Sequence, residues 1–167
     1  MPTVPLPDLE SELIACGRIV QDNDASVSVE EAEHRFNRFN RYVELVDSIR
    51  GTEDVRTARA LLSSMQAVHD YGAYQAALGK LVFGFPPSVV SEAVVAEAPR
   101  LIIELPQWAG EVLNMLVQAQ GKSEELVLAF NSKLAHAPAA EREAIIRFIR
   151  AQEREGWLEH KPGLLAT

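Results

Sequence analysis

The sequence predicts an all-α protein, and two observations lead to this fold class. Apolar residues recur at spacings of three and four along nearly the whole chain, which is the periodicity of amphipathic helices. No sustained alternation of apolar and polar residues occurs, and no Asn-Gly or Asp-Gly hairpin turn is present. A chain of 167 residues suits one domain, so we expect residues 1–167 to fold as a single all-helical unit.

The first helix is expected over residues 8–20, followed by a polar loop over 21–26. Ser28 is expected to cap a long second helix, because Glu31 stands three residues later and completes a capping box. Gly51 is expected to end that helix. The predicted buried face of the second helix consists of Val29, Ala32, Phe36, Phe39, Val43 and Val46.

Prolines and caps divide the rest of the chain. A third helix is expected from residue 52 or 53 with Val55, Ala58, Leu62 and Met65 inward, and a fourth over 71–83. Proline fits the first turn of a helix. The remaining expected segments are a helix from Pro86 or Pro87 to Glu97, a short turn that begins at Pro99, and helices that begin at Pro106, Ser123 and Pro138, the last ending at Gly156.

The helix that begins at Pro106 is apolar on most of its circumference. Only a narrow polar strip of Glu111, Asn114 and Gln118 interrupts its apolar surface. A helix of this kind is expected to be packed on two sides, as in the middle of a layered helical array. The regular spacing of helices predicts stacked antiparallel helical hairpins, as in HEAT or armadillo α-solenoids; a closed helical bundle is the alternative.

Charge and cysteine content restrict the function. The net charge of −8 opposes binding to phosphate backbones and favours either simple solubility or a basic protein partner. Cys16 is the single cysteine, so neither an intrachain disulfide nor a cysteine-rich zinc site is expected. A reducing compartment fits this cysteine content, and no run approaches the ~20 apolar residues of a membrane span.

Motifs of catalysis are missing from the sequence, so we expect no enzyme, no cofactor and no metal. There is no phosphate-binding glycine loop with Lys-Ser or Lys-Thr and no Gly-x-Ser-x-Gly elbow. Glu31 and His34 have the spacing used in di-iron bundles, but no second Glu-x-x-His motif exists, and an ion pair between Glu31 and Arg35 is the preferred interpretation.

The segment from Asp70 to Glu125 is acidic and contains aromatic residues. It holds seven carboxylates against three basic residues. Tyrosine and tryptophan edged by carboxylates can anchor a basic protein, although core packing is an equal alternative for these aromatics. The candidate partner-binding residues are Asp70, Tyr71, Tyr74, Glu104, Trp108, Glu111 and Asn114.

Several short motifs in the same region resemble a known family. These are "DYGAY" at residues 70–74, "FPP" at 85–87 and "PQWAGEVL" at 106–113, with "AFNSKL" and "REGWL" further on. Together they resemble the all-helical, HEAT-like immunity proteins of bacterial polymorphic toxin and contact-dependent growth inhibition systems. The resemblance covers roughly residues 70–158.

The resemblance implies a monomeric protein that forms a 1:1 complex with the C-terminal domain of a cognate toxin, often a nuclease, in the cytoplasm of the producing cell. It implies no direct contact with nucleic acid or membrane. A helical adaptor for another protein partner is the alternative, and an enzyme with a site assembled across several helices is a third interpretation.

Overall fold

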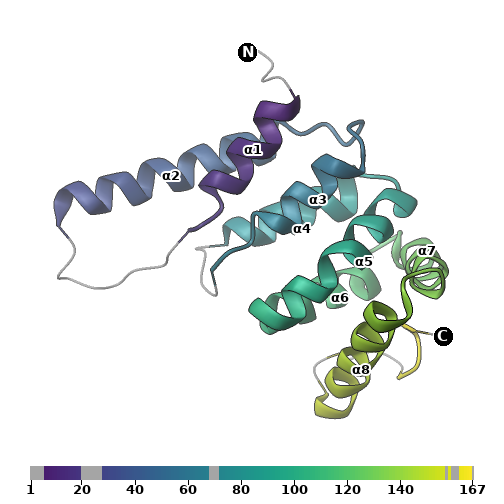
Figure 1. The fold of residues 1–167 in the computed structure, drawn as a ribbon. Coiled ribbons are helices and arrows are strands. Elements are labelled where there is room, and N and C mark those ends of the chain that lie inside the picture. The colour runs from purple at the N-terminus through teal and green to yellow at the C-terminus, as the bar shows by residue number, and fades with distance from the viewer. Residues whose placement is uncertain (1–5, 20–27, 68–71, 157, 159–161, 167) are drawn as a thin grey trace.

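The computed structural model describes residues 6–19, 28–67, 72–156, 158 and 162–166, and these ranges form eight α-helices and no strand (Figure 1). The predicted all-α class is confirmed. The helices are α1 (Leu6–Cys16), α2 (Val29–Ser48), α3 (Val55–Ser63), α4 (Ala73–Gly84), α5 (Pro87–Glu104), α6 (Pro106–Gln118), α7 (Ser123–Ala135) and α8 (Ala139–Glu155).

Helix contacts follow a regular order along the chain. Each odd-numbered helix from α1 to α5 contacts the next odd-numbered one, and α4 contacts both α2 and α6. Consecutive helices also pair, as in α1 with α2, α3 with α4, and α5 with α6. Helix α5 lies at the centre, since it contacts α3, α4, α6, α7 and α8. One apolar core runs through all eight helices.

Helix ends largely match the expected signals. The Ser28 side chain accepts a hydrogen bond from the Glu31 backbone N–H, at 3.2 Å, and begins α2 as predicted. Asp54 caps α3 in a similar way through the N–H of Arg56. Gly156 ends α8 in the left-handed conformation, where glycine lacks the steric penalty of other residues.

The expected turn at Pro99 is wrong, because α5 continues through this residue to Glu104. A proline inside a helix removes one hydrogen bond and costs about 3 kcal/mol. The helix survives because one buried face continues across the proline: Val94, Ala98 and Leu101 are all buried. Packing of this central helix on its neighbours therefore outweighs the local preference of proline.

The predicted buried face of α2 is also wrong over its first half. Phe36 is 63% exposed and Val29 is 86% exposed. The residues that α2 buries are Tyr42, Leu45 and Val46, all in its C-terminal half. Figure 1 shows why: the N-terminal half of α2 extends past α1 and α4, so no other helix covers it. Tertiary packing, rather than periodicity, selects which half of this helix is buried.

Helix α6 has the two-sided burial expected of it. Its contacts are with α4, α5 and α7. Most of its apolar surface is buried, including Trp108, Val112, Leu113 and Leu116. Of the predicted polar strip, Gln118 is exposed, whereas Glu111 and Asn114 are only half-exposed.

Candidate partner-binding surface

The structure separates the predicted contact residues into three groups. Asp70 and Tyr71 lie outside the described residues. Tyr74 and Trp108 belong to the core, with 0% and 7% of their surfaces exposed. A side chain with almost no accessible surface cannot anchor a partner directly, so we correct the candidate surface by removing both aromatics from it. Glu104, Glu111 and Asn114 form the third group, which keeps accessible surface.

Tyr74 is a structural hub rather than a surface anchor. Its ring makes edge contacts with Tyr42 of α2 and Trp108 of α6, at centroid distances of 6.0 and 5.2 Å. Its hydroxyl oxygen accepts hydrogen bonds from the backbone N–H groups of Gln66 and Ala67, at 2.9 and 3.1 Å. Tyr74 is therefore a core residue, which was the alternative to an anchor role for the aromatic residues of this segment.

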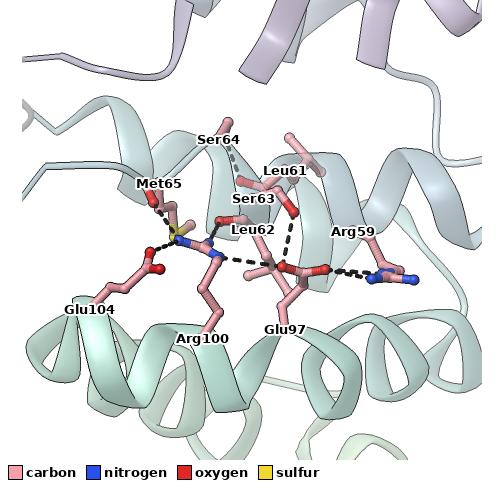
Figure 2. Close-up of polar contacts among 9 residues, drawn as sticks. All are labelled: Arg59, Leu61, Leu62, Ser63, Ser64, Met65, Glu97, Arg100 and Glu104. Atoms are coloured by element: carbon pink, nitrogen blue, oxygen red, sulfur yellow. Dashed lines mark hydrogen bonds and ion pairs between the residues drawn. The ribbon is translucent and has the colours of Figure 1, made fainter. Parts of the chain in front are cut away.

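Glu104 is exposed but already engaged. Its carboxylate accepts a hydrogen bond from Arg100 at 3.1 Å, one turn earlier in α5. Figure 2 shows that the same guanidinium also reaches back to the end of α3. There it donates to the carbonyl oxygen of Leu62 at 2.8 Å and, just after the helix, to that of Met65 at 3.2 Å. Arg100 thus holds Glu104 in place, and its positive charge partly offsets that of the carboxylate.

Glu97 is the buried carboxylate of this cluster, and Figure 2 places it between α5 and α3. It accepts hydrogen bonds from Arg59 at 3.0 Å and from the Ser63 hydroxyl at 2.9 Å. Arg100 lies 3.5 Å away. A buried carboxylate requires such partners, because an unpaired buried charge is strongly destabilising. The Glu97 carboxylate therefore joins α3 to α5 and is not available to a partner.

Glu111 differs from Glu104 in having no ion pair in the described part of the chain. It is half-exposed on α6, one turn before Asn114, whose amide oxygen Oδ1 is buried. Of the described residues proposed from the sequence, Glu111 is thus the carboxylate that has no ion pair within the described ranges and whose charge a partner can neutralise.

Several basic side chains make the same kind of contact with helix C-termini. Lysines and arginines donate hydrogen bonds to carbonyl oxygens at the C-terminal ends of helices, where the helix dipole favours positive charge. The contacts are Lys80 to Ile49 after α2 at 3.0 Å, Arg100 to Leu62 of α3 at 2.8 Å, Lys122 to Phe83 of α4 at 3.1 Å, and Arg142 to Ala135 of α7 at 3.1 Å.

Many carboxylates, in contrast, remain at the surface outside any ion pair of the described residues. They are Asp8, Glu30, Glu33, Asp47, Glu111, Glu124, Glu125, Glu141 and Glu143. These carboxylates lie at the surface of a chain whose net charge is −8. The arrangement suits a positively charged partner.

Carboxylates of α1 have a structural use. Glu12 forms a two-point contact with Arg41 of α2, with both N–O distances at 2.7 Å. Hydrogen bonding to Arg41 lowers the pKa of the Glu12 carboxyl, although partial burial acts in the opposite direction. Glu10 similarly contacts Arg56 of α3 at 2.7 Å. These pairs attach α1 to its neighbours.

Sequence reasoning missed one surface feature, the exposed apolar stripe on the first half of α2. We define this α2 stripe as Val29, Ala32 and Phe36, which are all exposed. A signal for it existed, since Tyr42, Leu45 and Ile49 form a second apolar row on the same segment. Two competing rows on one helix indicate that only one of them faces the core.

Cys16 and the two described histidines, His34 and His136, belong to no metal-binding cluster within the described ranges. Cys16 is half-buried at the end of α1, and burial raises the pKa of its thiol, which favours the protonated form. Glu31 pairs with Arg35 at 2.7 Å, as predicted, instead of acting with His34. Within the described ranges, no three His, Cys, Asp or Glu side chains lie close enough to hold a metal ion.

The described helices also lack the combination of length and hydrophobicity needed to cross a membrane. The chain matches no protein-family model, and neither the curated proteins nor the solved structures contain a significant match to it.

Proposed function

We propose that this chain is an immunity protein that binds and neutralises a cognate toxin domain, most simply a basic nuclease, by covering its active site or substrate surface. In this proposal the chain acts stoichiometrically, as a monomer in a 1:1 complex in the cytoplasm of the producing cell. It performs no catalysis and needs no cofactor.

The observation that carries the proposal is that basic and acidic side chains have different surroundings in the fold. Lys80, Lys122 and Arg142 face carbonyl oxygens at helix ends, whereas Glu111, Glu124 and Glu125 lie at the surface outside ion pairs of the described residues. Surface carboxylates of this kind attract a basic domain and compete for the groups that would hold its phosphate-containing substrate. The sequence resemblance to immunity proteins points to the same class of partner.

For the finer fold we infer a short stack of antiparallel helical hairpins. The support is the order of contacts, in which α1, α3, α5 and α7 follow one another and α2, α4 and α6 follow one another. Helical repeat proteins have contacts of this kind, and their curved faces bind partners. Glu111 and Asn114 would then lie on the row formed by the even-numbered helices.

A helical adaptor with a different protein partner is the second candidate. The exposed apolar α2 stripe favours it, because such a surface suits a partner helix or groove whatever the identity of that partner. Only the immunity proposal, however, requires protection of a cell from a toxic domain.

Co-expression distinguishes the two functions. The toxin domain would be the C-terminal region of a large exported protein encoded beside this chain, expressed from an inducible promoter with or without the chain. Restored growth, together with inhibition of the purified toxin at equimolar chain, supports the immunity function. If the toxin stays active at a molar excess of the chain, the proposal is wrong and the adaptor becomes the better interpretation.

A further inference from the structure

The first half of α2 carries an apolar stripe that the fold leaves uncovered. Val29 and Phe36 are separated by two helical turns and therefore lie on one side of the helix, with Ala32 between them. Their exposed fractions, 86% for Val29 and 63% for Phe36, leave most of both side chains in water. A single exposed hydrophobic residue is ordinary, but an ordered row on one face is typical of a binding surface.

Neighbouring helices do not compete for this stripe. The main contacts of α2 are with α1 and α4, and the residues that it buries begin only at Tyr42. In Figure 1 the N-terminal half of α2 extends clear of the other helices. A partner can therefore reach the stripe without any rearrangement of the core.

Charge beside the stripe selects the chemistry of the partner. Glu33 lies four residues after Val29 and three before Phe36, so it borders both apolar side chains. Glu30 lies three residues before Glu33 on the same flank, and both carboxylates are exposed and outside any ion pair of the described residues. This flank of the stripe is therefore acidic.

The basic residue that borders the opposite flank already has an ion-pair partner. Arg35 borders the stripe there, and its guanidinium pairs with Glu31 at 2.7 Å. Arg38 donates to the backbone carbonyl of Arg18, next to α1, at 3.3 Å. Arg38 keeps its positive charge, but it lies two residues after Phe36 and so on the far side of the helix. Among the described residues, the unpaired charges beside the stripe are therefore those of Glu30 and Glu33, which oppose nucleic acid and anionic membranes. They also oppose a second copy of this acidic chain.

We propose that the α2 stripe, with Glu30 and Glu33, docks a protein segment that has apolar side chains flanked by lysine or arginine. The apolar residues of that segment pack on Val29 and Phe36, while its basic residues face the two carboxylates. The inference rests on the proposed function in one respect: the toxin domain is taken as the natural source of this segment. The stripe itself is tested without any toxin.

A defined peptide provides the probe. It is a short helical peptide with leucines on one face and lysines beside them, and its control replaces every lysine with glutamate. Each is titrated into the isotopically labelled full chain, with amide shifts followed by NMR. We expect the lysine peptide to shift amides of residues 28–40 and the glutamate peptide to leave them unchanged.

Two pairs of variants sharpen the test. Phe36→Ser and Glu33→Lys should each weaken peptide binding at least about tenfold, as expected for an anchor and for a partly desolvated charge pair. Their matched controls are Leu128→Ser on α7, which removes a side chain of similar exposure at 64%, and Glu143→Lys on α8, which reverses another unpaired surface carboxylate. The controls should change binding by less than about twofold, and thermal melts should be similar for all four, because these positions are exposed.

Each other outcome overturns the inference. Shifts centred elsewhere, equal response to both peptides, or equal effects of variants and controls would remove the α2 stripe as a basic-segment site. Concentration-dependent dimerisation that Phe36→Ser abolishes would assign the stripe to a second copy instead. If the Phe36→Ser chain still neutralises the toxin, the stripe is not needed for immunity, and the docking inference fails while the immunity function stands. Co-expression of the unaltered chain tests the immunity function separately.

Discussion

Tyr74 of α4 donates a hydrogen bond from its hydroxyl to the carbonyl oxygen of Gly17, immediately after α1. The same oxygen accepts from two backbone N–H groups that follow α3, those of Gln66 and Ala67. One buried hydroxyl thereby satisfies three backbone groups and joins three parts of the chain. A side chain that the sequence makes attractive as an interface anchor instead holds the N-terminal half of the fold together.

Tyr74→Phe should lower the free energy of unfolding by about 1–3 kcal/mol, because buried backbone groups lose their partner while the ring remains. Tyr42→Phe is the matched comparison: it removes one hydrogen bond to Ser64, whose hydroxyl keeps its bond to Leu61. Urea melts should therefore give the larger loss for Tyr74→Phe. Equal losses in the two variants would contradict the hub role.

The contact between Glu12 and Arg41 makes a prediction about pH. Hydrogen bonding to Arg41 holds the pKa of the folded Glu12 carboxyl below its unfolded value of about 4.3. Its stabilising effect is therefore complete above the unfolded pKa and is lost as pH falls through the folded pKa. Both side chains are more than a third exposed, so the effect should stay below about 1 kcal/mol.

Glu12→Gln should consequently melt at a lower temperature than the unaltered chain at neutral pH, and the difference should shrink in strongly acidic solution. Thermal melts of both proteins across this pH range provide the measurement. A difference in melting temperature that grows on acidification would have the wrong sign and would rule out this linkage.

Two glycines should respond in opposite ways to alanine. Gly79 lies inside α4 with open space where a Cβ would stand, so Gly79→Ala should stabilise the protein by roughly 0.5–1 kcal/mol through helix propensity. Gly51 has a φ of +82° and its Cβ would overlap the carbonyl oxygen of Gly84. Gly51→Ala should therefore destabilise by more than about 1 kcal/mol. Urea melts that rank the two variants in the reverse order would contradict the geometry.

Leu116→Ala tests the position of α6 in the core. Leu116 is fully buried, so removal of its side chain should leave a cavity and cost about 2–5 kcal/mol. Urea denaturation gives this value directly. A loss under about 1 kcal/mol would mean that α6 is peripheral, in conflict with its contacts to α4, α5 and α7.

Helix positions and one strongly apolar helix were predictable because they depend on local signals. Ser28, Pro87 and Gly156 mark helix ends because their effects on the backbone depend only on residues close in sequence. Helix α6 has too few polar residues to lie at the periphery of the fold. The interpretation of Pro99 failed because the burial of Val94, Ala98 and Leu101 on one continuous face outweighs the local cost of proline.

Surface properties were less predictable, since they depend on which residues meet in space. Phe36 has the right spacing for a core residue, but no helix packs on that half of α2. Glu104 looks free in the sequence and is held by Arg100, whereas Glu111 retains an uncompensated charge. Only the fold separates carboxylates used in internal ion pairs from those that a partner can neutralise.

Calorimetric titration of this chain with the purified toxin domain encoded beside it tests the central claim, that an acidic helical surface captures a basic toxin. The titration is made at two salt concentrations, with the unaltered chain and with Glu111→Lys. We expect a 1:1 complex with a Kd of about a nanomolar or below that weakens as salt is raised, and weaker binding by Glu111→Lys with unchanged thermal stability. Absence of binding, or a Kd that neither salt nor Glu111→Lys alters, would contradict the account.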